Sequence, residues 1–333
     1  MTVINGIEID NVKYIQNEIK EAIVNNDPIE ENLHVVIVIS NPCQYARRYI
    51  LAKEFIKRFD DEENVILYIV ELAFNNHKFQ VTESKNPRHL QIRTTTQPLW
   101  HKENMINLGV QKLLPKNWKA FAWIDADIEF DSASWALDTL KILNGCRDIV
   151  QLFSHCSDMD HNENPMRIFQ SFGFQYTKKK EYNIPGLLNF WHPGFAWAIT
   201  RKAYDKAGGI YEKSILGSGD HNISLSLIGR GVYSINNETT DGYKQTIIDY
   251  QNKISKLRVG YVPGFIRHYF HGSKQNRKYI ERWKILVKHK YNPYEHIEHD
   301  KNGLLIPSKK CPQELLNEIY QYFSERNEDE FFK

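Results

Sequence analysis

Apolar residues along the chain follow two spacings, one typical of buried strands and one typical of helices. Residues 33–40 and 65–72 are near-continuous apolar runs rich in Val and Ile, as expected for parallel strands buried on both faces of a sheet. Between them, residues 45–60 place apolar side chains at helical spacing. This order of strand, helix and strand predicts an α/β fold whose parallel strands are joined by a right-handed crossover.

The same patterns predict further elements along the chain. Residues 75–99 are polar and irregular, with room for an edge strand, and residues 155–190 are expected to be a loop-rich insertion. The expected helices cover residues 11–26, 100–114, 134–143, 201–207, 223–229, 283–289 and 313–326, with a polar helix within 236–256, and the remaining strands cover residues 119–124, 148–154 and 264–270.

The strand expected over residues 119–124 runs directly into Asp125, Ala126 and Asp127. In an extended segment, side chains two apart point the same way, so the two carboxylates would share one side while Ala126 faces the other. Ligands of open α/β sheets gather beyond the carboxyl ends of such strands, and oxygen ligands suit Mg²⁺ or Mn²⁺ carrying a diphosphate. The alternative is structural, with Asp127 capping the turn towards Ser132 and Asp125 solvated at a strand end.

With this motif the sequence resembles nucleotide-sugar-dependent glycosyltransferases of the GT-A type, in their galactosyltransferase-like or family 2-like forms. The resemblance covers roughly residues 33–285. It implies a Rossmann-like α/β fold, with a mostly parallel central sheet, helices on both faces and a loop-rich acceptor half. It also implies transfer of a sugar from a nucleoside-diphosphate sugar, a UDP-sugar being favoured, to a hydroxyl of a glycan or glycoconjugate, with Mn²⁺ or Mg²⁺.

On this basis the chain divides into three parts. Residues 1–30 are expected to be an N-terminal helical extension, and residues 31–290 the glycosyltransferase domain, with a nucleotide-binding half up to residue 130 and an acceptor half after it. Residues 291–333 are expected to be an irregular segment followed by an amphipathic helix.

The resemblance also implies the donor site. His271, followed by a glycine and a basic loop, is the expected third metal ligand; His268 is the second choice, because strand alternation would aim it at the opposite face. Lys274 and Arg277 would offset phosphate charge. The other residues expected at the nucleotide sugar are Asn41, Glu71, Lys102, Asn107, Asp125 and Ala126.

On the acceptor side, the family commonly has two adjacent acids after glycines, one of which deprotonates the acceptor hydroxyl. Here Gly219 is followed by Asp220 alone, so Asp220 is the candidate base. The structural alternative is a helix N-cap. The residues expected to bind the sugars are Trp191, His192, Gly194, Trp197, Asp220 and His221.

Composition bears on the binding partners and the cellular location that we expect. The formal net charge is +2 with no basic stripe, which gives no reason to expect nucleic acid or another polyanion. Four scattered cysteines without zinc-like spacing, and the lack of any apolar run long enough to span a membrane or act as a signal sequence, lead us to expect reduced thiols and a cytoplasmic location.

Two other functions stay open. One is a carbohydrate-binding protein that has the fold without catalysis. The other is a magnesium-dependent enzyme of phosphate chemistry, such as a haloacid-dehalogenase-like phosphatase, which is disfavoured because those enzymes place the Asp-x-Asp after the first strand, whereas here two strands precede it. The sequence does not specify the sugar, the base, the acceptor or the oligomeric state. It also leaves open whether the anomeric configuration is inverted or retained, and with retention Asp220 would bind the acceptor or the donor instead of acting as the base.

Overall fold

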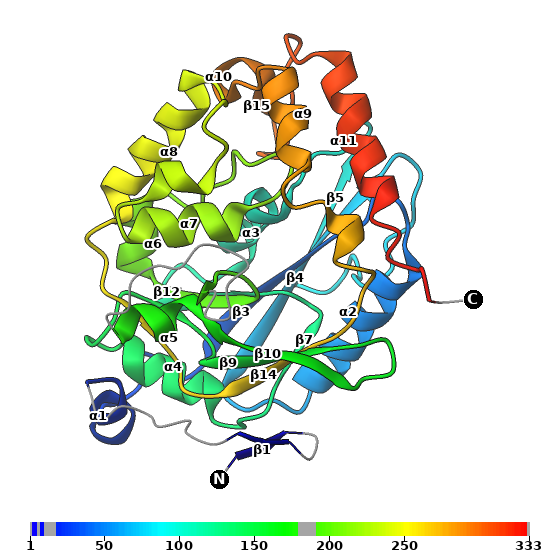
Figure 1. The fold of residues 1–333 in the computed structure, drawn as a ribbon. Coiled ribbons are helices and arrows are strands. Elements are labelled where there is room, and N and C mark those ends of the chain that lie inside the picture. Colours follow the sequence, from blue (N-terminus) through cyan, green and yellow to red (C-terminus); the bar gives the residue numbers. More distant parts are fainter. Residues whose placement is uncertain (1, 5–6, 10–17, 179–190, 332–333) are drawn as a thin grey trace.

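The centre of the computed structural model is a seven-stranded sheet (Figure 1), and the structure describes residues 2–4, 7–9, 18–178 and 191–331. The strand order is β13-β8-β12-β6-β3-β4-β5, and β12 alone among these seven runs opposite to its neighbours, which confirms the mainly parallel α/β fold. The strands are β3 (Leu33–Ser40), β4 (Val65–Phe74), β5 (His89–Thr94), β6 (Ala120–Ile124), β8 (Ile149–Gln151), β12 (Ala196–Thr200) and β13 (Val259–Tyr261).

Two hydrophobic cores cover the two faces of this sheet, and β3 contributes to both. Val36 belongs to one core while Val35 and Ile37 belong to the other, because successive side chains of a strand point to opposite faces. The helices that pack around the sheet are α1 (Glu18–Asn25), α2 (Ala46–Phe59), α3 (Lys102–Leu113), α4 (Trp135–Leu143), α6 (Arg201–Ala207), α7 (Gly219–Leu227) and α8 (Asp241–Ile254).

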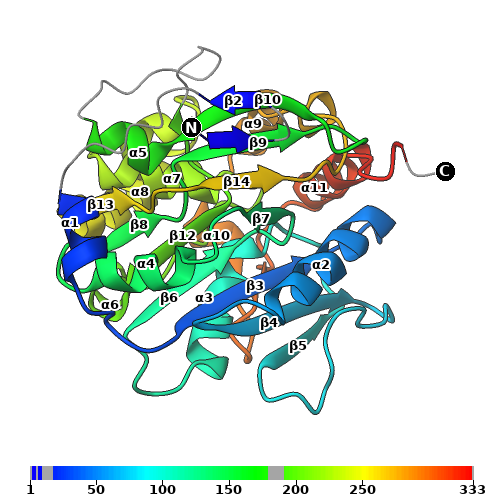
Figure 2. The ribbon, with the colours of Figure 1, turned by 90° about the horizontal axis from the view of Figure 1, so that it is seen from below.

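A second, five-stranded sheet lies beside the first, with the order β11-β10-β9-β14-β7 (Figure 2). It overturns the expectation of a loop over residues 155–190, because most of the described part of that stretch is regular structure. β9 reads His-Cys-Ser-Asp-Met and is buried throughout, so its polar composition hid a strand that lies between β10 and β14. The elements are β7 (Ile128–Phe130), β9 (His155–Met159), β10 (Pro165–Ser171), α5 (Phe172–Thr177), β11 (Trp191–His192) and β14 (Phe265–His268).

The C-terminal part returns to the main body, where α11 packs against α9. β15 and β16 pair as a small antiparallel ribbon, so the segment expected to be irregular contains regular structure. In Figure 1, α9, α10 and α11 gather on one side of the molecule. The elements are α9 (Arg282–Lys288), α10 (Pro293–His296), β15 (Ile297–His299), β16 (Leu305–Pro307) and α11 (Gln313–Glu325), with short 3-10 helices at Gly231–Ser234 and Gln275–Arg277.

The N-terminal part differs in detail from expectation. The helix expected over residues 11–26 is described only as α1, since residues 10–17 lie outside the described residues. A hairpin of β1 (Thr2–Ile4) and β2 (Ile7–Ile9) was not expected. Across the residues that the structure describes, none of the helices combines the length and the apolar character that crossing a membrane requires.

Candidate active site

A cavity of about 770 Å³ opens at the carboxyl ends of β3 and β6. This is the edge of an α/β sheet at which ligands bind. Its wall combines segments that are far apart in the sequence, including Ser40 and Asn41 at the end of β3, Lys102 on α3, Asp125 and Asp127 after β6, Asp220 on α7, His268 and His271 from the end of β14 onward, and Phe323 and Arg326 from the C-terminal part.

One group of side chains in this wall has the composition of a metal site. Asp127, His268 and His271 each offer one ligand atom, and these atoms lie within 4.8 Å of one another. His271 Nε2 is 2.9 Å from Asp127 Oδ2 and 3.3 Å from His268 Nε2. The expectation that His268 faces away was wrong, because β14 ends at His268 and the chain turns before it reaches His271. The two imidazoles therefore converge on one carboxylate.

The orientation of His268 is fixed from behind by an acid. His268 Nδ1 is 2.7 Å from Asp158 Oδ1, so the hydrogen at Nδ1 is donated to this carboxylate and Nε2 is left to face Asp127. Burial lowers the pKa of His268 despite the two acids, and the ring is neutral at neutral pH. Burial alone would raise the pKa of Asp127, but His271 and His268 outweigh it and hold this pKa below its usual value.

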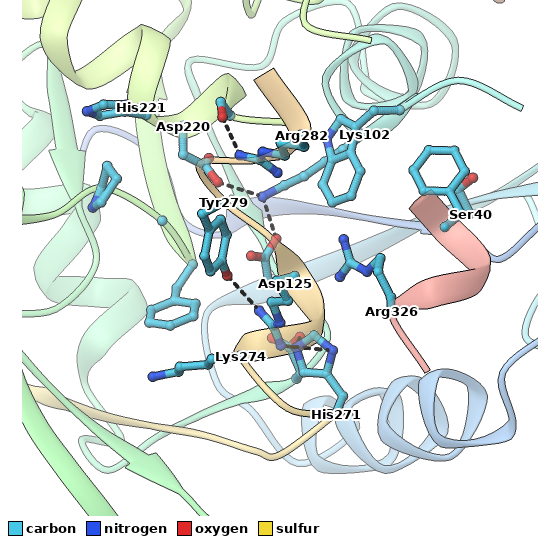
Figure 3. Close-up of a pocket in the computed structure, with 18 of the residues that line it drawn as sticks. Ser40, Lys102, Asp125, Asp220, His221, His271, Lys274, Tyr279, Arg282 and Arg326 are labelled. Atoms are coloured by element: carbon cyan, nitrogen blue, oxygen red, sulfur yellow. Dashed lines mark hydrogen bonds and ion pairs between the residues drawn. The ribbon is translucent and has the colours of Figure 1, made fainter. Parts of the chain in front are cut away.

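The other aspartate of the motif lies in a different environment. Lys102 Nζ is 2.6 Å from Asp125 Oδ1 and 3.0 Å from Asp220 Oδ2, so a single ammonium bridges the strand end and helix α7 (Figure 3). Burial raises the pKa of Asp125 to about 6, against the opposing effect of Lys102. Residues 125–127 form a turn and not an extended segment, which separates the surroundings of the two aspartates.

The start of α7 explains how Asp220 reaches this lysine. Ser218 is the N-cap residue, with φ +79°, and Asp220 lies in the first turn of the helix, so the expected alternative of an Asp220 N-cap does not hold. Gly219 lies against Glu103, whose carboxyl group would overlap any Cβ at that position. Burial raises the pKa of Glu103 to about 8. Glycine at 219 thus allows α7 to approach α3.

Basic side chains surround the metal-type cluster. Arg277 Nη2 lies 2.7 Å from His271 Nε2, and Lys274 is ion-paired with Asp158. Glu328, with only 1% of its surface exposed, is ion-paired with Arg48 and Arg326. The C-terminal residues therefore help to build this end of the cavity.

The cavity collects most, but not all, of the residues expected from the sequence. Those that line it are Asn41, Lys102, Asp125, Ala126, Asp127, His192, Gly194, Asp220, His221, His271, Lys274 and Arg277. Burial lowers the pKa of His192 to about 3 and that of His221 to about 4, so both rings are neutral at neutral pH.

Four expected residues lie elsewhere. The Glu71 carboxylate accepts hydrogen bonds from the backbone of residues 80–82 and from the Thr82 hydroxyl, so it organises a loop. The Asn107 amide binds Ile210 and Glu212 behind α3. Trp191 and Trp197 are buried in the core, where ring packing explains them without a sugar.

Several residues of the wall were missed in the sequence. Asp158 was hidden in a stretch taken for a loop, and Arg48 lies on a helix whose pattern indicated only burial. Arg326 follows a terminal helix that carries no chemical motif, and so does Glu328, which pairs with Arg48 and Arg326 behind the wall. Only Arg282 had a signal, since it ends the basic run that begins at Lys274.

Comparisons with known proteins find likenesses in structure only. No protein-family model matches the chain, and no curated protein matches it. The structure is similar to the catalytic domain of Drosophila beta1,4galactosyltransferase 7, solved in complex with xylobiose (TM-score 0.40, 10% identity, covering 88% of this chain and 99% of that one). It is also similar to the mannosyltransferase PcManGT from Pyrobaculum calidifontis, solved with GDP-Man and Mn²⁺ (TM-score 0.41, 13% identity, covering 78% of this chain and 62% of that one).

A third similar structure is S. aureus TarS 1-349 (TM-score 0.42, 10% identity, covering 77% of this chain and 64% of that one). The chain thus spans less than two thirds of two of these three proteins. The first two names are those of glycosyltransferases, the class that the sequence resembles. At such low identity the function has to be inferred from the cavity itself.

Proposed function

We propose that the protein transfers a sugar from a nucleoside-diphosphate sugar to an acceptor hydroxyl, with the help of Mn²⁺ or Mg²⁺. The observation that carries the proposal is the pairing of two sites in one cavity. One is the cluster of Asp127, His268 and His271, and the other is the Asp220 carboxylate, held by Lys102. A cation site beside an oriented carboxylate is what displacement of a diphosphate by a hydroxyl requires.

The residues present fit a divalent cation. Asp127 Oδ1 is buried and has no hydrogen-bond partner among the described residues, and leaving such an atom unpaired is costly unless a ligand supplies the partner. A carboxylate oxygen together with two imidazole nitrogens is a donor set that suits a transition-metal dication such as Mn²⁺. Bound there, the cation would stabilise the negative charge that develops on the leaving diphosphate.

The surrounding basic residues would bind the diphosphate. Arg277 has no carboxylate within ion-pairing distance among the described residues, and its 2.7 Å contact with His271 Nε2 places its guanidinium at the His271 end of the cavity. A guanidinium can donate two parallel hydrogen bonds to phosphate oxygens. Arg277 is therefore assigned to the diphosphate, with Lys274 near it. A uridine nucleotide is the donor that the sequence resemblance favours.

The chemical step follows from the position of Asp220. The acceptor oxygen attacks the anomeric carbon, the bond from that carbon to the diphosphate oxygen breaks, and its electron pair leaves with the diphosphate. Asp220 takes the proton of the acceptor hydroxyl, and Lys102 keeps the carboxylate oriented through its 3.0 Å contact. A single displacement of this kind inverts the anomeric configuration.

Turnover of nucleotide sugars tests this function. The unmodified protein is incubated with Mn²⁺ and a panel of UDP-, GDP-, ADP-, CDP- and dTDP-sugars, and release of the nucleoside diphosphate is measured with and without EDTA. We expect metal-dependent release from one donor class, and its loss in Asp127→Asn. Asp131→Asn is the matched control, since Asp131 pairs with Arg267 outside the cavity.

Two results would count against transfer. Release of diphosphate at an unchanged rate in Asp127→Asn would exclude the proposed cation site. Binding of a nucleotide sugar without turnover, for every donor and with simple sugars added as acceptors, would favour the carbohydrate-binding protein instead.

A further inference from the structure

Arg282 is a buried arginine that lines the cavity at the start of α9. Only 8% of its surface is exposed. Its guanidinium donates hydrogen bonds to the hydroxyls of Ser218 and Tyr322 and lies over the ring of Tyr279, with 5.2 Å between the guanidinium carbon and the ring centre. These partners are all neutral. Among the described residues, no carboxylate lies within ion-pairing distance of Arg282.

Most other cations in the wall are compensated by acids. Lys102 has two carboxylates, Lys274 has Asp158, and Arg48 and Arg326 share Glu328. A charge taken out of water is stable only when a counter-charge or a full set of hydrogen bonds replaces its hydration. Arg282 has some of these hydrogen bonds but no counter-charge within the part of the chain that the structure describes. An anionic group of a ligand would supply that counter-charge.

The place of Arg282 separates this anion from the donor diphosphate. Its guanidinium donates a hydrogen bond to Ser218, which precedes Asp220 by two residues in the chain. Figure 3 shows Arg282 beside Asp220 at one end of the cavity and His271 at the other end, with Tyr279 between them. The diphosphate is assigned to the His271 end. An anion at Arg282 therefore belongs to the molecule whose hydroxyl meets Asp220.

The guanidinium is held in place before any ligand arrives. Gly217, at φ +90°, lies against it, and a Cβ at that position would come within 2.8 Å of Arg282 Nη1. With Ser218, Tyr279 and Tyr322 on its other sides, the planar group has little freedom. A fixed guanidinium loses little entropy when it binds a phosphate or a carboxylate.

Exposed apolar side chains line the mouth of the cavity, and one of them, Tyr279, stacks on Arg282. Tyr233 is 76% exposed, Ile280 79% and Tyr279 49%, and all three line the cavity. Aromatic rings that keep one face in water suit the apolar faces of sugar rings. The mouth thus combines sugar-stacking surface with a fixed positive charge.

We propose that the acceptor is an anionic carbohydrate, whose phosphate or carboxylate group binds Arg282 while a nearby hydroxyl meets Asp220. This inference rests on the proposed function, because it takes Asp220 as the group that receives the acceptor's proton. It concerns the acceptor alone, so it can fail while sugar transfer stands.

A binding experiment tests the assignment without knowledge of the acceptor. The donor end is first filled with Mg²⁺ and whichever of UDP, GDP, ADP, CDP or dTDP stabilises the protein most against heat. Inorganic phosphate is then titrated as the anionic probe, and its affinity is taken from the thermal shift and from calorimetry. Arg282→Gln, Arg282→Lys and Arg277→Gln are compared with Lys284→Gln, an exposed residue of the same helix, as the control.

We expect Arg282→Gln to weaken phosphate binding by about tenfold or more, as for loss of a charged hydrogen-bonding group. Arg282→Lys should recover part of that affinity, and Lys284→Gln should resemble the unmodified protein. Arg277→Gln should instead weaken the nucleoside diphosphate. Phosphate bound equally well by Arg282→Gln would overturn the proposal, and so would a loss of nucleotide affinity in Arg282→Gln as large as in Arg277→Gln. If no nucleoside diphosphate binds at all, the proposed function fails, and the phosphate titration of the free protein still decides the role of Arg282.

Discussion

Asp125 and Asp127 belong to the same turn and line the same cavity, yet their charges are balanced in different ways. Asp125 faces the ammonium of Lys102, which is covalently part of α3 and is shared with Asp220. Asp127 faces His271 and, further off, His268. One carboxylate therefore has a permanent counter-charge, whereas the other has imidazole partners, of which His268 is neutral at neutral pH.

This difference assigns separate tasks to the two aspartates. A carboxylate that already has a lysine gains little from a cation, while one that meets imidazole nitrogens and has an oxygen without a partner in the described part of the chain gains much. The Asp-x-Asp motif is then not a symmetrical clamp. Its second acid would hold the metal, and its first acid would hold Lys102 against Asp220.

The largest contrast is expected in metal affinity. Asp127→Asn should weaken Mn²⁺ binding by on the order of 100-fold or more, since it removes a direct ligand and loss of even an outer partner costs about 10- to 100-fold. Asp125→Asn should change Mn²⁺ affinity only a few-fold. Electron paramagnetic resonance of free Mn²⁺ measures both. Equal losses in the two variants would show that both acids hold the cation.

Lys102 should matter for stability as well as for turnover. Lys102→Met leaves Asp125 and Asp220 without their counter-charge, and we expect a loss of about 2–3 kcal/mol in the free energy of unfolding, since removing one partner of a buried pair is costly. Urea denaturation measures this value. Lys112→Met, an exposed position on the same helix, is the control. A change no larger than that of the control would mean that water already screens the two acids.

Asp158 should affect the metal through His268, although it also pairs with Lys274. Asp158→Asn removes the acid that accepts the hydrogen of His268 Nδ1, and we expect Mn²⁺ affinity to fall by about tenfold. Asp160→Asn, in the exposed turn that follows β9, is the matched control. Unchanged affinity in Asp158→Asn would mean that His268 is oriented by packing and not by this contact.

The smallest effect concerns the acid next to Lys102. The pKa of Glu103 is raised by burial to about 8, so between pH 4.5 and 8 the unfolded chain releases a proton that the folded protein keeps. Stability contributed by this group therefore falls as the pH rises through that interval. In Glu103→Gln the fall is absent.

We accordingly expect the stability of Glu103→Gln relative to the unmodified protein to increase between pH 5 and 8, by at least about 1–2 kcal/mol. Thermal unfolding at several pH values measures the difference. A constant difference across this interval would mean that Glu103 is ionised in the folded protein and shares Lys102 with Asp125 and Asp220.

The sequence was most informative where one local pattern dominates. The apolar run of β3 has the predicted bounds, and α6 begins and ends as predicted because Gly208 and Gly209 follow it at positive φ. β9 could not be predicted, since its polar residues are buried only through pairing with strands that are distant in the chain. The spacing of apolar residues predicts the secondary structure that a segment prefers by itself, whereas a strand such as β9 forms because of contacts with distant strands.

The same limit applies to the site. Asp125, Asp127 and His271 were found because they follow strands in a recognisable order, and all three line the cavity. The predicted orientation of His268 was wrong because the prediction assumed that the strand continues to His271, whereas β14 ends at His268. The whole-chain charge of +2 gave no sign of an anionic ligand, because the uncompensated charge of Arg282 is local and depends on which acids the fold brings near.

The most direct test of the account is the position of the metal. Crystals grown with Mn²⁺ and the nucleoside diphosphate that binds best would be measured at the manganese absorption edge. We predict an anomalous peak at coordination distance from Asp127, His268 and His271, with the diphosphate on its open side and Lys102 still bound to Asp125. A manganese peak held by Asp125, or a diphosphate bound away from the two histidines, would contradict it.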